Sequence, residues 1–453
     1  RGAVVAGRSV DAPPHPAAAS AAASAAGSSM AARTGLMDTM MLLGRAPRTP
    51  ACAGLRGRRR DGSPAIVENA PASMVPTSSI APEPGSVLTP RALNRALLAR
   101  QQLLERTART PLEVVEHLVG LQAQDPKAPY YGLWTRIADF DPEALSDLLI
   151  ERAVVRVALM RSTIHLVSGR DALALRPLLQ PLIERATESN WGAGVHSVDR
   201  AALAAAGRAL VDAEPRTFAQ LGEALSPRWP DADPKGLAQM VRALVSLVQV
   251  PPRGLWGRGG AAAHTSAEAW LDGVAAEAPA PSAADVVRRY LAAFGPASVA
   301  DVQKWSGLTR LAPVLATLRP ELVSFSDEAG RELFDLPDAP RPAPETPVAL
   351  RLVAPFDNVL LSHVDTTRIL PAEHRGRVMT QNGLVPGTYL VDGFVQGTWK
   401  VQTAGKRAAT LAVTPFGKTT KKTRTALTRE GERLLAFAAP AATRRTVELS
   451  AGG

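Results

Sequence analysis

Hydrophobic and polar positions follow a pattern that occurs three times along the chain: short amphipathic helices followed by a pair of strands. In the first occurrence, helices are expected from Thr89, from Thr110 and near residues 142–151, where capping residues precede apolar positions at helical spacing. Residues 154–159 and 161–167 are rich in β-branched side chains and partly alternate, which predicts two strands. Helices followed by a strand pair are typical of a winged-helix unit.

The same pattern returns in residues 217–260 and 284–336. The second occurrence combines a helix over 218–225, an amphipathic helix over 235–250 and a Gly/Arg-rich loop of the wing type over 251–260. The third is the clearest, because a turn at 327–330 joins two strand-like segments. Its expected elements are helices over 285–294, 299–306 and 310–318 and strands over 322–326 and 332–336.

A Pro-rich joint at residues 337–347 separates these units from a strand-rich C-terminal segment. The dipeptides Asp392-Gly393 and Ala404-Gly405 favour hairpin turns there. The expected elements are strands over 349–354, 387–391, 393–401 and 408–414 and a helix over 424–438. We therefore predict an α+β fold of tandem winged-helix units followed by a β-rich C-terminal domain. The expected boundaries are 89–200, 201–283, 284–347 and 348–453.

Composition narrows the possible chemistry. Cys52 is the single cysteine among 453 residues, which excludes a disulfide framework and a multi-thiolate metal site. The seven histidines are dispersed and offer no convincing ligand spacing, so we expect no metal and no cofactor. The chain contains no run of about eighteen apolar residues, so we expect no transmembrane helix. The net charge of +10 favours a polyanionic partner or a membrane surface.

Residues 1–88 differ in composition from the rest of the chain. They are rich in Ala, Ser, Pro and Gly without sustained periodicity, so we expect a disordered extension. This extension contributes +4 of the net charge, which leaves the body of the chain basic in its own right. The chain begins with Arg1, and Met74 is a candidate start. No apolar signal segment follows the arginines, so we expect a bacterial cytoplasmic, nucleoid-associated protein.

Four sequence blocks resemble the AlkZ/YcaQ type of winged-helix DNA glycosylases. The first is Leu121-Gln122-Ala123-Gln124-Asp125-Pro126, followed by Gly132-Leu133-Trp134-Thr135-Arg136. The others are Met160–Val167, Ala354–His363 and Val391–Trp399, in the order of the family. The resemblance covers about residues 89–440. The chain departs from the family pattern at Ser162, where Gly is frequent, and lacks an Arg that often follows Asp365.

The resemblance implies a monofunctional DNA glycosylase that hydrolyses the N-glycosidic bond of alkylated purines in double-stranded DNA. In the AlkZ branch it also implies unhooking of interstrand crosslinks. The catalytic motif of that branch, Gln-apolar-Gln, maps onto Gln122, Ala123 and Gln124, whereas the YcaQ branch has Gln-apolar-Asp. Gln124 therefore places the chain closer to AlkZ.

Two glutamines suit this chemistry, because an N7-alkylated purine is already cationic and leaves without acid catalysis. The enzyme then needs a positioned water and dipoles that favour the cation. On an ideal helix, residues two apart point about 200° apart. Gln122 and Gln124 would converge only if the expected helix from Thr110 unwinds before Asp125-Pro126. From their spacing alone, Gln122 and Gln124 are better interpreted as ordinary polar residues at a frayed helix end. The resemblance to the family favours the catalytic interpretation instead.

Other residues are candidates for DNA contact. Arg161, Thr163 and His165 alternate, so they are expected on one strand face, either facing DNA or satisfying local backbone groups. Tyr130, Tyr131 and Trp134 are expected in the core. Arg253 and Arg258 lie with Trp256 in the Gly-rich loop, where contact with phosphates or a groove is expected. Lys400, Lys421 and Lys422 are candidates for phosphate contact or for a solvated face.

Two other functions fit the same pattern of elements. A non-enzymatic winged-helix regulator would dimerise on spaced half-sites. A protein–protein scaffold would show no salt-dependent affinity for DNA. A glycosylase with three units in one chain is instead expected to act as a monomer.

Overall fold

The computed structural model describes residues 82–273, 281–380, 383–405 and 407–450. Disorder is expected over residues 1–88, and residues 1–81 of this extension lie outside the described residues. Its end is ordered, because Val87 and Leu88 form strand β1. All described residues belong to one compact unit.

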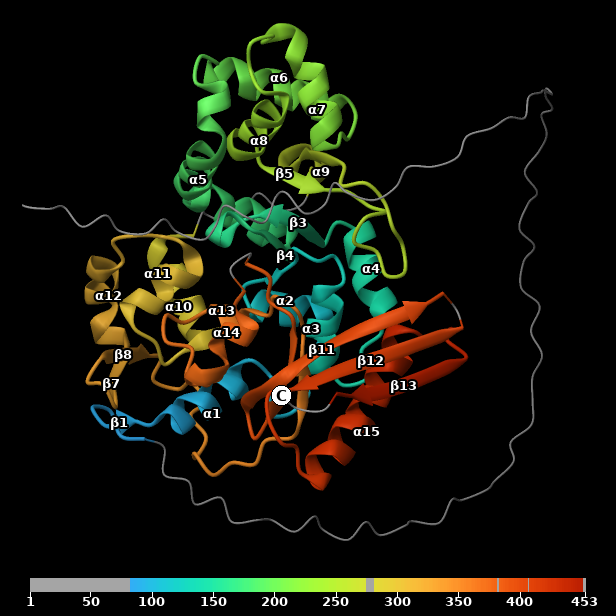
Figure 1. Cartoon of the computed structure of the whole chain (residues 1–453). Coiled ribbons are helices and arrows are strands. Elements are labelled where there is room, and N and C mark those ends of the chain that lie inside the picture. The colour runs from blue at the N-terminus through green and yellow to red at the C-terminus, as the bar shows by residue number, and fades with distance from the viewer. Residues whose placement is uncertain (1–81, 274–280, 381–382, 406, 451–453) are drawn as a thin grey trace, which may run out of the picture. The chain divides into compact units, whose positions relative to one another are not determined.

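Strands from the first and second expected units form a single five-stranded sheet, in the order β2-β4-β3-β5-β6 (Figure 1). Each neighbouring pair is antiparallel. Helices α5 to α8 gather above β3 and β5 in the view, and α2 to α4 lie below β4. The strands are β2 (Leu121–Gln122), β3 (Val154–Ala158), β4 (Ile164–Ser168), β5 (Leu247–Gln249) and β6 (His264–Ser266).

The expected strand pair over 154–167 is confirmed, whereas the expected helix over 235–250 is too long. Helix α8 covers Pro234–Leu244, and Leu247–Gln249 form β5. Val248 and Gln249 pair with β3, so tertiary strand pairing overrides the local helical periodicity. The loop from β5 to β6 is the expected wing.

The helices begin mostly at Ser, Thr or Asp caps, as the sequence indicates. The helices of the helical and mixed part are α1 (Pro90–Arg100), α2 (Pro111–His117), α3 (Ala128–Arg136), α4 (Pro142–Ile150), α5 (Gly169–Trp191), α6 (Arg200–Ala213), α7 (Phe218–Leu225), α8 (Pro234–Leu244), α9 (Ala267–Trp270), α10 (Ala283–Phe294), α11 (Val299–Ser306) and α12 (Ala312–Leu318). Further along are α13 (Asn358–Leu361), α14 (Arg375–Val378) and α15 (Lys421–Ala438), with 3-10 turns η2 (Met160–Ser162), η3 (Gly192–Val195), η4 (Ser226–Arg228), η5 (Arg319–Glu321) and η6 (Ala372–His374).

The third expected unit is confirmed as three helices, α10 to α12, followed by the hairpin β7 (Val323–Asp327) and β8 (Glu332–Asp335). The strand β1 adds to this hairpin in parallel with β7. The start of the described chain therefore packs on a unit that lies more than 200 residues later in the sequence.

The C-terminal segment forms a second five-stranded sheet, in the order β13-β12-β11-β10-β9. Its strands are β9 (Arg351–Val353), β10 (Gly387–Val391), β11 (Phe394–Ala404), β12 (Ala408–Pro415) and β13 (Arg444–Leu449). The four expected strands and the helix after them are confirmed, and the overall α+β class with them. The edge strand β13 was not expected, because most of its side chains are exposed and give no hydrophobic alternation.

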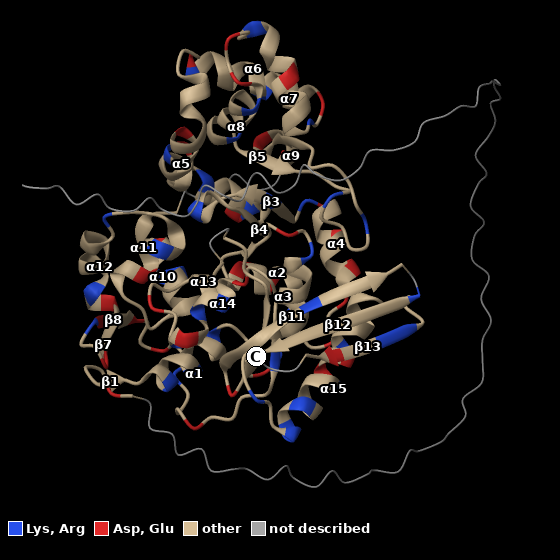
Figure 2. Ribbon diagram, viewed as in Figure 1, with Lys and Arg blue, Asp and Glu red and all other residues tan. Residues whose placement is uncertain are grey.

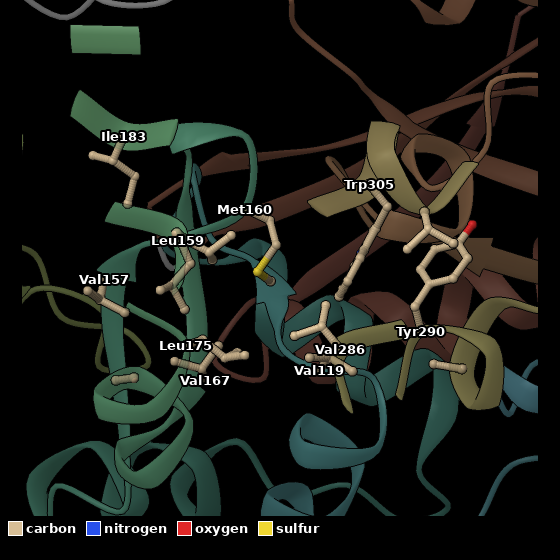
Figure 3. Packing of buried hydrophobic residues seen from close by; sticks show 14 of the residues in the cluster. Val119, Val157, Leu159, Met160, Val167, Leu175, Ile183, Val286, Tyr290 and Trp305 are labelled. Atoms are coloured by element: carbon tan, nitrogen blue, oxygen red, sulfur yellow. The ribbon is translucent and has the colours of Figure 1, made fainter. Parts of the chain in front are cut away.

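The largest hydrophobic cluster extends from β3 and β4 through η2 to α10 and α11. Figure 3 shows Met160 of η2 between Leu159 on one side and Trp305 of α11 on the other. Met160 is 1 % exposed and Trp305 is fully buried. The turn between β3 and β4 therefore packs against the third unit and does not project into solvent.

A buried ion pair ties α1 to the third unit. Arg100 and Asp335 have fully buried side chains, and their closest atoms lie 2.6 Å apart. Arg341 shares the same carboxylate at 2.5 Å. Removal of the carboxylate would leave two guanidinium groups without their acidic partner in the interior, which is costly.

We expect Asp335→Ala to lower the apparent free energy of unfolding by about 3–5 kcal/mol, because a buried cation loses its counterion. Urea unfolding followed by circular dichroism measures this. The control is Glu332→Ala, which removes an exposed ion pair with Arg319 and should cost less than about 1 kcal/mol. Equal losses for the two variants would contradict the role of the buried pair.

Candidate active site

The Gln-Ala-Gln motif lies on an extended segment, not at a helix end as expected from the sequence. Helix α2 ends at His117, and Val119 and Gly120 follow with φ of 54° and 93°. Strand β2 then pairs with β4, and the Ala123 N–H continues the pairing to Ile164 O at 2.8 Å. Gln122 is the last residue of β2, and Gln124 follows two residues later in a bend. The motif therefore needs no unwinding of a helix end.

Gly120 is required at the turn that starts this segment. A Cβ there would lie 2.5 Å from Val167 Cγ1 and 3.0 Å from Leu166 O. Its φ of 93° is also unfavourable for other residues. The backbone of the motif is thus set by close contact between Gly120 and β4.

Gln122 is held by Arg161. Its side chain is 8 % exposed, and its Oε1 accepts a hydrogen bond from Arg161 Nη2 at 2.8 Å. A guanidinium only donates, so this bond fixes which end of the amide is oxygen. Arg161 also donates to Trp305 O at 2.6 Å and to Asn358 Oδ1 at 3.1 Å.

The expected row of Arg161, Thr163 and His165 on one strand face is wrong. Arg161 lies in η2, before β4 begins at Ile164, and both Arg161 and Ser162 have positive φ. Thr163 donates from Oγ1 to Met160 O at 3.1 Å, the local backbone role that the sequence left open. His165 is fully buried, so it has no surface to present to DNA in this structure.

Burial sets the protonation of the groups around the motif. Burial, with the neighbouring Arg161 charge, lowers the pKa of His165 to about 3, so its imidazole is neutral near pH 7. Burial lowers the pKa of Arg161 to about 10, so the guanidinium stays charged. His165 Nδ1 donates to Thr163 O at 3.0 Å. Neither group exchanges a proton near neutral pH.

Gln124 differs from Gln122 in its surroundings. Its side chain is exposed, and its Oε1 is 3.5 Å from the Ile164 N–H, a long contact. Asp125 follows with its carboxylate accepting from the Lys127 N–H at 2.8 Å. The motif thus combines one fixed, buried amide with one amide that is open to solvent.

Asn358 joins this site and was not singled out as a functional residue from the sequence. It begins α13, is 3 % exposed and donates from Nδ2 to Gly120 O at 3.3 Å. Asp357 caps α13 and pairs with buried Arg136 of α3 at 2.7 Å. The signal available in the sequence was two adjacent polar residues inside the otherwise apolar block 354–361.

The wing between β5 and β6 lies beside the motif. Arg253 and Arg258 of the wing line a cavity of about 150 Å³ together with Asp125 and Lys127. Trp256 is less free than expected, because its ring packs at 4.8 Å from both Tyr130 and Phe437. The expected core positions of Tyr130, Tyr131 and Trp134 are confirmed by their burial.

The other candidate cations lie on different elements. Lys400 is exposed on β11, and Lys421 and Lys422 are exposed in the first turn of α15. Figure 2 shows Lys and Arg residues on the strands of the C-terminal sheet and on α15. Their contact with DNA stays a prediction.

Two kinds of feature are absent from the part of the chain that the structure describes. There, no group of three or more His, Cys, Asp or Glu side chains could hold a metal ion. Within the same residues, no helix is long and apolar enough to cross a membrane.

The chain matches a known protein family over much of its length. The family model described as DNA glycosylase AlkZ-like matches residues 115–437. The chain belongs to the AlkZ-like DNA glycosylase family. It is therefore a DNA glycosylase, an enzyme that acts on N-glycosyl bonds of DNA.

Individual relatives support the same family. An interstrand DNA cross-link repair glycosylase of Streptomyces sahachiroi is 26 % identical over 353 residues, which cover 71 % of this chain and 89 % of that protein. The solved structure of Streptomyces sahachiroi DNA glycosylase AlkZ aligns with a TM-score of 0.63 at 22 % identity, over 80 % of this chain and 100 % of that one. The structural likeness confirms the fold.

We expect Gly120→Ala to lower the apparent free energy of unfolding by about 2–4 kcal/mol, because strain at positive φ adds to a clash with β4. Gly330→Ala is the matched control, with a φ of 76° and open space around its Cβ position. It should cost only about 1–2 kcal/mol. Urea unfolding compares the two, and equal costs would contradict a close contact at Gly120.

Proposed function

We propose that this enzyme removes N7-alkylated purines from duplex DNA by hydrolysis, with a water held between Gln122 and Gln124. The observation that carries the proposal is the pair of amides two residues apart, one fixed by Arg161 and one open to solvent. A positioned water is the main requirement when the leaving base is already cationic. We also propose that the enzyme acts as a monomer in the bacterial cytoplasm.

The two amides take different roles in this proposal. Gln122 Oε1 already accepts from Arg161, so Gln122 orients the water chiefly through its Nε2–H group. Gln124 Oε1 accepts a hydrogen bond from the water and directs the oxygen lone pair to C1′ of the sugar, and the proton that the water loses passes to solvent. The amide dipole at Gln124 also puts partial negative charge near the developing oxocarbenium ion.

Arg161 is a positioning residue in this mechanism rather than a DNA contact. Among the described residues, it donates hydrogen bonds to Gln122, Trp305 O and Asn358, so its donors are directed to groups of the protein. Its role is to hold Gln122 in one rotamer. Asn358 in turn links this arrangement to the backbone of Gly120.

Crosslink unhooking is part of the proposal. The Streptomyces sahachiroi relative is named an interstrand DNA cross-link repair glycosylase. A crosslink through purine N7 atoms presents the same cationic leaving group as a single N7-alkylpurine. The same water would release both.

The test is release of base from duplex DNA with a single N7-methylguanine and from an N7-crosslinked duplex, scored as abasic sites after alkali. We expect wild type to release both. Gln122→Ala/Gln124→Ala should slow release by about 100-fold or more, because the water loses both partners. Asn190→Ala, which removes an exposed amide on α5, is the control and should match wild type.

Release by the double variant at the wild-type rate would refute the roles of the two glutamines while leaving the activity in place. Failure of wild type on both duplexes would refute the proposed lesion class.

Arg161→Lys separates positioning from DNA contact. We expect the single-turnover rate to fall about 10- to 100-fold, because lysine cannot bridge Gln122, Trp305 and Asn358 at once. DNA affinity and its dependence on salt should stay unchanged. A DNA contact at Arg161 would instead weaken binding and reduce the salt slope by about one. Fluorescence anisotropy across a salt series measures this.

A further inference from the structure

The cavity beside the motif is built from two loops that are far apart in the sequence. Asp125 and Lys127 line one side, and the wing residues Arg253, Trp256 and Arg258 line the other. The cavity therefore begins at the residue that follows Gln124. We refer to it as the wing cavity.

The walls of the wing cavity carry an excess of positive charge. Arg253, Arg258 and Lys127 face a single carboxylate, Asp125. Asp125 already accepts the Lys127 N–H at 2.8 Å. Arg253 donates from Nη1 to Gly260 O at 3.0 Å, and its Nε is buried without a partner among the described residues.

A buried guanidinium lies directly behind this wall. Arg156 of β3 is 2 % exposed and donates from Nη2 to Ala123 O at 2.7 Å. Its Nη1 lies 3.4 Å from the position of a Cβ on Gly254, a residue that lines the cavity. Within the described chain, its Nε and Nη1 have no hydrogen-bond partner. Burial and the nearby charge of Arg253 lower the pKa of Arg156 to about 10, which leaves it charged near pH 7.

The wing is held in place before any ligand arrives. Tyr130 donates from its hydroxyl to Gly254 O at 2.7 Å, and the Trp256 N–H donates to Ser146 Oγ at 3.1 Å. The Trp256 ring also packs on Phe437 of α15. The arginines of the wing therefore start from a fixed backbone, which reduces the entropy lost on binding.

The charge of the cavity selects its ligand. A cationic alkylated purine would meet like charges there, so the cavity does not suit the departing base. A phosphate group suits it, because a guanidinium presents paired donors to two phosphate oxygens. Glycines at 254, 259 and 260 let backbone approach such a group closely.

We propose that the wing cavity binds one backbone phosphate of the DNA strand that carries the lesion, next to the nucleotide attacked at Gln124. The inference rests on the proposed function, because the position of the reacting sugar decides which phosphate reaches the cavity. Arg253 and Arg258 bind the phosphate directly. Arg156 adds its charge from behind Gly254 and ties the cavity to Ala123 of the motif.

The test uses duplexes with one tetrahydrofuran abasic analogue and one neutral methylphosphonate, moved through the phosphates on both sides of the analogue. Affinity is measured by fluorescence anisotropy. We expect wild type to bind about tenfold more weakly when the methylphosphonate occupies one particular position in the lesion strand. Other positions should have smaller effects.

Arg253→Gln/Arg258→Gln provides the decisive comparison. This double variant should bind the unmodified duplex at least tenfold more weakly than wild type. A methylphosphonate at the sensitive position should not weaken its binding further, and the slope of log affinity against log salt concentration should be lower by about two. Arg185→Gln, an exposed arginine on α5, is the control and should behave as wild type. Thermal unfolding of each variant confirms that the fold is kept.

Three outcomes would overturn the proposal. One is a scan with no sensitive position, and another is a sensitive position that affects the double variant as strongly as wild type. The third is a flat scan together with an increase of melting temperature by inorganic phosphate in wild type only, which would assign the cavity to free phosphate. Because binding is measured without base release, failure to release N7-methylguanine would refute the proposed lesion and leave this result unaffected.

Discussion

The arrangement of the candidate active site depends on one buried guanidinium. Arg161 donates to Gln122 of β2, to the carbonyl of Trp305 at the end of α11 and to Asn358 of α13. These partners come from three segments that are separated by more than 50 residues in the sequence. A charged group in the interior is tolerable only when it is well satisfied, so the three segments must stay together for Arg161 to stay buried. The geometry of Gln122 is thus coupled to the packing of the third unit and the C-terminal segment.

The helix–hairpin units of this chain are not independent domains. Strands β5 and β6 extend the sheet of β3 and β4, and this shared sheet places the wing of one unit beside the motif of another. The strand β1 and helix α1 likewise join the third unit, where Arg100 pairs with Asp335. Positions of the motif and the wing relative to each other are therefore set by backbone pairing, which is less variable than the packing of independent domains.

The sequence was sufficient for most elements and insufficient for the site. Caps, turn residues and alternation located the third unit and the C-terminal strands, because those signals are local. The long helix α5 has a local cap at Ser168, but Pro177 and Pro181 lie inside it and contradict a continuous helix, whose support comes from packing on α8. The extended form of Gln122 depends on pairing with β4, and the partners of Arg161 are distant in the sequence. Only the resemblance to a family identified the two glutamines as catalytic candidates.

The surroundings of the motif also limit which bases can leave. A neutral purine needs a proton at the base before its glycosidic bond breaks readily, and that proton must come from an acid near the site. His165 has a pKa of about 3 and is neutral near pH 7, and Arg161 retains its proton because its pKa is about 10. Neither group can protonate a departing base. A lesion that already carries a positive charge needs no such donor, which supports the proposal that the substrates are alkylated purines.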